Sequence, residues 1–128
     1  MRLLLDTHAL LWWLLNDEAL SRVARQAIAD EENDVFVSAA SAWEITTKHR
    51  IGKLPSAALV AAGVAFAVAS EGFAELPVTI RDGQIAGGLP AIHKDPFDRM
   101  LIAQAVNQDL VLVSNEALFN AYGVARLW

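Results

Sequence analysis

The chain has 128 residues, of which 55% are apolar and 20% are charged. This composition excludes a disordered tail or a low-complexity linker, and it predicts one domain, residues 1–128, with a substantial hydrophobic core. The chain has no cysteine, which excludes a disulfide framework, a thiolate metal site and a cysteine nucleophile. We therefore expect a protein of a reducing compartment, by default the cytoplasm.

Charge and hydropathy limit the partners that we expect. Ten Lys and Arg against fifteen Asp and Glu give a net charge of −5, which argues against a protein that holds nucleic acid by charge alone. The longest apolar run, residues 57–69, spans 13 residues, whereas a membrane-spanning helix needs roughly 18 or more. Near the amino end, Asp6 interrupts an apolar run after three leucines. We expect neither a signal peptide nor a membrane partner.

Short apolar runs with abrupt polar ends alternate with helical patterns along the chain. In the first half, the sequence predicts a strand at 2–5, helices at 9–15 and after a Ser21 cap, a strand at 35–37, a helix from Ser38 or Ser41 to about His49, and a helix at 57–69 weakened at Gly63. In the second half, it predicts a strand within 73–78, a helix from Thr79 to 87–88, a helix opened by Asp95-Pro96, a strand at 111–113, a helical turn at 116–119 and a last strand within 124–128. This alternation predicts an α/β domain around a central, mostly parallel sheet.

Four acidic positions carry the functional signal. In a parallel sheet the ligand site lies beyond the carboxyl ends of the strands. Asp6 directly follows the first predicted strand, and Ser114-Asn115-Glu116 follows a later one in the same way. Glu44 lies inside an otherwise apolar helix start, and Asp98 lies in the first turn of the helix that Asp95-Pro96 opens. We expect all four acids near the same edge of the sheet.

Each acid also has a purely structural interpretation. Asp6 and Asp95 suit the N-cap position of a helix, and Asp98 suits a capping box or the helix dipole. Glu44 and Lys48 have the spacing of an ordinary exposed helix pair, and Glu116 suits the start of a helical turn. The coincidence of the four acids is therefore the signal, rather than any one of them.

Clustered carboxylates repel one another, and a divalent cation among them removes the conflict. Because the cluster offers only oxygen donors, we expect Mg²⁺, with Mn²⁺ as the alternative, rather than Zn²⁺. Such a site suits phosphodiester hydrolysis, in which the cation activates water and neutralises charge on the phosphate. The acids therefore predict nuclease chemistry.

The segments that carry these acids resemble the PIN-domain family, and within it the VapC-like ribonuclease toxins of bacterial type II toxin-antitoxin pairs. The resemblance rests on Leu4-Leu5-Asp6-Thr7-His8-Ala9, Ser41-Ala42-Trp43-Glu44-Ile45, residues 93–103 and Leu112-Val113-Ser114, in the family's order. It implies a PIN-like three-layer α/β/α domain, with catalytic, metal-binding acids at Asp6, Glu44 and Asp98. The fourth acid departs from the family pattern, because Glu116 stands where the family usually has Asp. Asp95, Ser114 and Asn115 are auxiliary candidates.

The same resemblance implies a Mg²⁺-dependent endoribonuclease that forms a homodimer and is inhibited by a cognate antitoxin, whose C-terminal segment lies over the active-site groove. Two alternatives stay open. A phosphatase with Asp6 as nucleophile is disfavoured, because that pattern has a second Asp where this chain has His8. A catalytically weak or silent PIN-fold interaction module is the other, since Glu116 departs from the pattern.

Two further groups have both a functional and a structural interpretation. Basic residues flank the acids, and they either grip RNA phosphates or form solvated helix faces; they are Lys48, His49, Arg50, Lys53, His93, Lys94 and Arg99. Trp12 and Trp13 point about 100° apart on a helix, so either one of them serves a partner surface or both are buried between the sheet and a neighbour.

Overall fold

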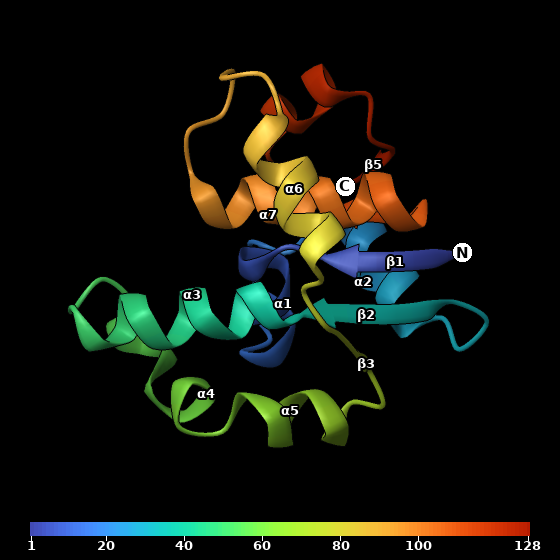
Figure 1. Ribbon diagram of the computed structural model, residues 1–128. Coiled ribbons are helices and arrows are strands. Elements are labelled where there is room, and N and C mark those ends of the chain that lie inside the picture. The colour runs from blue at the N-terminus through green and yellow to red at the C-terminus, as the bar shows by residue number, and fades with distance from the viewer.

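A computed structural model of the protein describes residues 1–128 (Figure 1). Its centre is a sheet of five strands in the order β3-β2-β1-β4-β5, and every neighbouring pair is parallel. The strands are β1 (Arg2–Leu5), β2 (Asp34–Ser38), β3 (Ala74–Leu76), β4 (Val111–Val113) and β5 (Arg126–Leu127). Strand β1 lies in the middle, where Leu4 is in register with Phe36 on one side and Leu112 on the other. The expected α/β class and parallel sheet are confirmed.

Helices follow the strands in alternation. They are α1 (Thr7–Leu14), α2 (Arg22–Ala29), α3 (Ala39–Arg50), α4 (Ala58–Ala62), α5 (Val64–Ser70), α6 (Ile80–Gly88) and α7 (Pro96–Gln108), with 3₁₀ turns η1 (Pro55–Ala57) and η2 (Ala117–Tyr122). None of these helices is long and apolar enough to cross a membrane.

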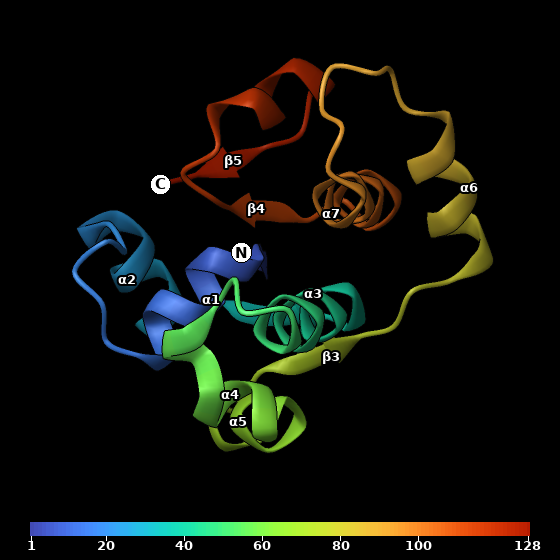
Figure 2. The same ribbon diagram turned by 90° about the vertical axis from the view of Figure 1, so that its left-hand side faces the viewer.

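The two faces of the sheet carry separate cores, because successive side chains of a strand point to opposite faces. Leu3 and Leu5 pack with residues of α1, α2, α4 and α5, and with Ile45 of α3. Leu4 packs with Leu101 and Ile102 of α7 on the other face. Figure 2 shows the resulting layers, with α6 and α7 on one side of the sheet and α2, α4 and α5 on the other. The predicted three-layer α/β/α arrangement is confirmed.

The boundaries of several elements differ from those that the sequence predicts. The first helix begins at Thr7 rather than at residue 9, because Asp6 caps it. The apolar run 57–69 is divided at Gly63, whose φ of −158° and ψ of 57° are not helical. The last strand is only Arg126–Leu127, since η2 continues to Tyr122 and Gly123 then takes a left-handed conformation with φ of 73°.

A buried polar network joins α6 to α7. Asp82 is fully buried, and its carboxylate accepts hydrogen bonds from the Thr79 N–H at 2.9 Å and from Nδ2 of Asn107 at 2.9 Å. Burial raises the pKa of Asp82, but these hydrogen bonds outweigh it and hold the pKa below its usual range. The network fixes α6 against the helix that carries Asp98.

Candidate active site

Three of the predicted acids come from three different elements that meet at the carboxyl edge of the sheet. Asp6 directly follows β1, and its N–H donates to the Val113 carbonyl of β4 at 3.1 Å. Oδ1 of Asp6 also accepts from the Ala9 N–H at 2.8 Å and so caps α1. Glu44 lies in α3, and Asp98 lies in the first turn of α7. Asp6 and Glu44 are buried, at 5% and 3% exposure.

Glu44 is fixed by contacts on both of its oxygens. Oε1 accepts a hydrogen bond from Oγ1 of Thr7 at 2.6 Å, and the same hydroxyl lies 3.1 Å from Oγ of Ser41. Oε2 forms an ion pair with Nζ of Lys48, one turn further along α3. The helix pair that the sequence predicts is therefore present, but one of its partners is buried at the site rather than exposed.

Asp98 lies beside His93 and Asp95. Nε2 of His93 is 2.9 Å from Oδ2 of Asp98, although the ring N–H does not point at the carboxylate and makes no hydrogen bond. Nδ1 of His93 accepts from the Asp95 N–H at 3.3 Å, which favours the tautomer with its proton on Nε2. Asp95 is the N-cap of α7, since its Oδ1 accepts from the Phe97 N–H at 2.8 Å.

Burial and neighbouring carboxylates raise the pKa values of Asp98 and Asp6. Burial, and then the charges of Asp95, Glu44 and Asp6, raise the pKa of Asp98 to about 7. Burial and the Glu44 charge also raise the pKa of Asp6, against hydrogen bonds from Ser114 and Ala9 that lower it. The acids thus form one site with an excess of negative charge, which is the electrostatic pattern of a functional site.

Lys48 supplies part of the compensating charge. Burial lowers the pKa of Lys48, but the hydrogen bond and charge of Glu44, followed by the charges of Asp95 and Asp98, outweigh it and raise this pKa. The ammonium group therefore stays protonated within the acidic cluster.

The end of β4 contributes Ser114 to this site. Ser114 is buried, and its Oγ accepts from the Glu116 N–H at 3.0 Å. Glu116 and Asn115 are exposed. Oε1 of Glu116 accepts from the Leu118 N–H at 3.1 Å, so that its carboxylate caps η2. The structure thus brings Asp6, Glu44, Asp98 and Asp95 into one electrostatic cluster. Glu116 lies at the surface, two residues after the buried Ser114.

The donor set fits a hard divalent cation in its chemistry. Its members are oxygen donors, and the charges of Asp95, Glu44 and Asp6 raise the pKa of Asp98, a repulsion that a cation relieves. In the present side-chain arrangement, no three Asp, Glu or His side chains are placed to hold a metal ion. Glu44 and Asp98 face the positive or polar groups of Lys48 and His93 instead. These are the contacts that a bound cation would replace.

Arg99 has a structural role that sequence reasoning missed. Its Nη1 donates to the carbonyl oxygens of Pro90 (2.9 Å) and His93 (3.1 Å), and its Nη2 donates to those of Ala86 (2.8 Å) and Leu89 (2.7 Å). The guanidinium therefore joins the end of α6 and the following loop to α7. The interpretation of Arg99 as a residue that grips phosphate is corrected, because its terminal nitrogens are already used.

The structure gives both adjacent tryptophans, Trp12 and Trp13, partly buried positions, which favours the second of their two interpretations. Trp12 packs near Trp128, with ring centroids 5.8 Å apart, and Trp13 packs near Phe73 at 6.2 Å. Both are half-buried against the core. The exposed tryptophan is Trp43, at 64%. Its position directly before Glu44 is the sequence signal that points to it.

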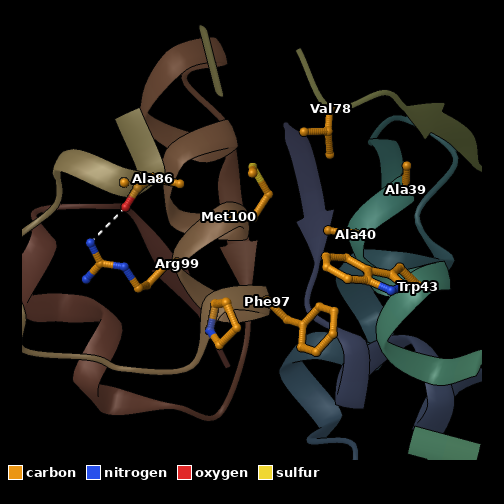
Figure 3. A pocket seen from close by; sticks show the side chains of 10 residues that line it. Ala39, Ala40, Trp43, Val78, Ala86, Phe97, Arg99 and Met100 are labelled. Atoms are coloured by element: carbon orange, nitrogen blue, oxygen red, sulfur yellow. Dashed lines mark hydrogen bonds between the residues drawn. The ribbon is translucent and has the colours of Figure 1, made fainter. Parts of the chain in front are cut away.

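Trp43 lines a cleft between α3 and α7 (Figure 3), and its chain neighbour Glu44 belongs to the acidic cluster. The cleft has a volume of about 440 Å³ and is lined mainly by apolar residues, among them Ala40, Val78, Phe97 and Met100. Arg99 and Ala86 also line the cleft, and Nη2 of Arg99 donates to the Ala86 carbonyl (Figure 3).

Comparison with known proteins agrees with this architecture. The family model described as "PIN domain" matches residues 3–124. No curated protein matches the chain in sequence. Similar solved structures include VapBC2 from Rickettsia felis bound to a promoter DNA fragment (TM-score 0.68, 11% identity, covering 98% of this chain and 97% of that one). Another is VapC20 from Mycobacterium tuberculosis, a toxin that cleaves the sarcin-ricin loop (TM-score 0.67, 18% identity, covering 96% of this chain and 96% of that one). A third is FitAcB from Neisseria gonorrhoeae (TM-score 0.62, 19% identity, covering 97% of this chain and 95% of that one). From its sequence match and its fold, the chain belongs to the PIN domain family.

Proposed function

We propose that the protein is a metal-dependent endoribonuclease and the toxin of a type II toxin-antitoxin pair. The observation that carries this proposal is the cluster of Asp6, Glu44 and Asp98 at the carboxyl edge of the sheet, in which neighbouring acids disfavour the charged forms of Asp6 and Asp98. The names of the similar structures support it, since VapC20 is described as an RNA-cleaving toxin and VapBC2 is a complex with its promoter DNA.

Each site residue has a role in this proposal. Asp6, Glu44 and Asp98 would hold Mg²⁺ or Mn²⁺, with Thr7 orienting Glu44 through the 2.6 Å hydrogen bond. When bound, the cation supplies Lewis-acid chemistry, because it neutralises the charge that develops on the phosphate and the leaving oxygen. Asp95 fixes the first turn of α7 and so the position of Asp98.

The proposal includes two protein partners. A cognate antitoxin is supported by the similar structures, whose names describe VapBC and FitAB assemblies. A homodimer is the second expectation, and it rests on the resemblance to the toxin family. We also propose that residues 1–128 are one PIN domain in a cytoplasmic protein.

The direct test is cleavage of a mixed RNA by the purified protein, with Mg²⁺ or with a chelator. We expect cleavage with Mg²⁺ only, and we expect Asp6→Asn to reduce its rate by about 100-fold or more, a loss typical for removal of one electrostatic contact to a transition state. Asn is a good N-cap, so α1 keeps its cap. The variant therefore tests the loss of the negative charge without a loss of the helix cap. Equal cleavage by the variant would show a contaminating nuclease, and no cleavage together with no metal binding would favour the silent interaction module.

Glu116 is proposed as a fourth acid, and the structure suggests a substitution that isolates its charge. In Glu116→Gln the side-chain oxygen still accepts from the Leu118 N–H, so the cap of η2 is retained. We expect the Mg²⁺ concentration for half-maximal cleavage to rise several-fold, with a smaller loss of rate than in Asp6→Asn. If the Mg²⁺ dependence does not change, Glu116 is only a helix cap.

A further inference from the structure

Trp43 is an unusual surface residue, because a large aromatic side chain is normally buried. It is 64% exposed although it lies on α3 directly before Glu44, which is 3% exposed. The two neighbours therefore differ sharply, with the acid turned into the site and the indole turned into the cleft beside it. This position places an accessible aromatic side chain next to one of the proposed metal ligands.

A second aromatic ring supports Trp43. The Phe97 ring packs edge-to-face against the indole, with centroids 4.9 Å apart and planes at 73°. Phe97 directly precedes Asp98, so the pair is joined in sequence to two of the three proposed metal ligands. Figure 3 shows the two side chains facing each other between α3 and α7. Because Trp43 is 64% exposed, most of the indole surface remains accessible despite this contact.

The surroundings of the pair favour a base attached to a phosphate. Nζ of Lys48 lies 5.8 Å from the Phe97 ring centroid, which places positive charge at the rim between the rings and the acids. The rest of the lining is mainly apolar and includes Val78 and Met100, with Arg99 as its charged member. A volume of about 440 Å³ is at the small end of ligand pockets, which suits one nucleotide better than a protein helix.

We infer that Trp43 and Phe97 form a stacking platform for one base of single-stranded RNA beside the cleaved bond, and that Trp43 thereby contributes to substrate preference. The inference rests on the proposed ribonuclease function. Aromatic side chains are the usual contact for unpaired bases, and this contact tolerates sequence because every base has a π-face. Arg99 also lines the cleft, but its two terminal nitrogens are held by four backbone carbonyl oxygens, so they are not free to read base edges.

The test compares Trp43→Phe, which keeps a flat ring, with Trp43→Leu, which keeps an apolar side chain without a π-face. Leu59→Ala, on α4, removes another exposed apolar side chain and is the control. The probe is a short, labelled, randomised single-stranded RNA pool, with binding measured by anisotropy in chelator and cleavage measured in Mg²⁺. We expect Trp43→Leu to weaken binding and raise KM about 10-fold, with kcat little changed. Trp43→Phe and Leu59→Ala should stay near the wild type.

Each result decides between named alternatives. If Trp43→Leu binds and cleaves as the wild type does, the platform is wrong and the nuclease proposal stands. Weaker antitoxin binding in that variant, with unchanged KM for RNA, would assign the cleft to protein docking and also reject the platform. If RNA binding depends on Trp43 but no protein cleaves in Mg²⁺, the platform stands and the nuclease proposal fails. An equal loss in Trp43→Phe and Trp43→Leu with lowered melting temperatures would show a structural role only.

Discussion

The Asp98→Asn variant is expected to lose RNA cleavage and, without metal, to melt at a higher temperature than the wild type. Burial and the charges of Asp95, Glu44 and Asp6 raise the pKa of Asp98 to about 7. A carboxylate with such a pKa is destabilising when it is ionised, and the cost is on the order of 2 to 4 kcal/mol. An uncharged amide avoids this cost but cannot replace the carboxylate as a metal ligand.

The sign of the pH dependence follows from where the proton is bound. Between about pH 4 and pH 7, folded Asp98 keeps a proton that the unfolded chain has already lost, so rising pH in this window lowers the free energy of unfolding. The increase in the free energy of unfolding that Asp98→Asn brings should therefore be small near pH 4, grow between about pH 4 and pH 7, and stay constant above pH 7. At about pH 8 we expect it to raise the melting temperature by about 5 °C or more.

The measurement is thermal unfolding in chelator across this pH range, together with RNA cleavage in Mg²⁺. Glu18→Gln is the matched control, because it removes one exposed carboxylate away from the cluster. It should change neither the cleavage rate nor the pH dependence. A melting temperature for Asp98→Asn at or below that of the wild type at about pH 8 would contradict the electrostatic account. Undiminished cleavage would reject Asp98 as a catalytic residue.

Arg99→Met is expected to be the most destabilising substitution near the site. The variant loses four hydrogen bonds from a charged donor to the carbonyls of residues 86–93, and it leaves those oxygens to find other partners. Because such contributions are not additive, we expect a loss of about 3 kcal/mol in the free energy of unfolding. Cleavage should also fall, since the same loop carries His93 and leads to the Asp95 cap of α7.

Urea denaturation at neutral pH measures this loss, and two other variants show its cause. Arg50→Met removes an exposed arginine from α3 and should change stability little. Arg99→Lys keeps the positive charge but lacks the planar guanidinium group, so it should recover only part of the free energy of unfolding that Arg99→Met loses. If Arg99→Met unfolds at the wild-type urea concentration, the tether does not contribute, and the earlier interpretation of Arg99 as a phosphate ligand becomes open again.

Much of the fold is predictable from local patterns. Asp95-Pro96 predicts the start of α7 because both residues suit their positions in any helix, and the weakness at Gly63 becomes a break for a similar local reason. The order of the strands was beyond prediction, because it depends on contacts between residues far apart in the chain. The tether of Arg99 spans only 6 to 13 residues, but no local pattern indicates which carbonyl oxygens a guanidinium will reach. The exposure of Trp43 was missed although Glu44 follows it directly.

The site likewise has residues that a local pattern predicts and residues that it does not. Position after a strand predicted Asp6, and an acid in an apolar helix start predicted Glu44. No pattern indicated that Lys48 would reach into the cluster as a counter-charge, since its spacing from Glu44 is that of an ordinary surface pair. The role of a side chain at the site thus depended on burial, which spacing alone does not reveal.

The lengths of the two edge strands limit how copies of this chain can associate. Strand β3 has three residues and β5 has two, whereas a stable strand pairing between chains needs a longer row of free backbone groups. Short edges protect a parallel sheet against edge-to-edge aggregation. A homodimer of this protein would therefore be built from helix surfaces, and its sheet would end at β3 and β5 in each copy.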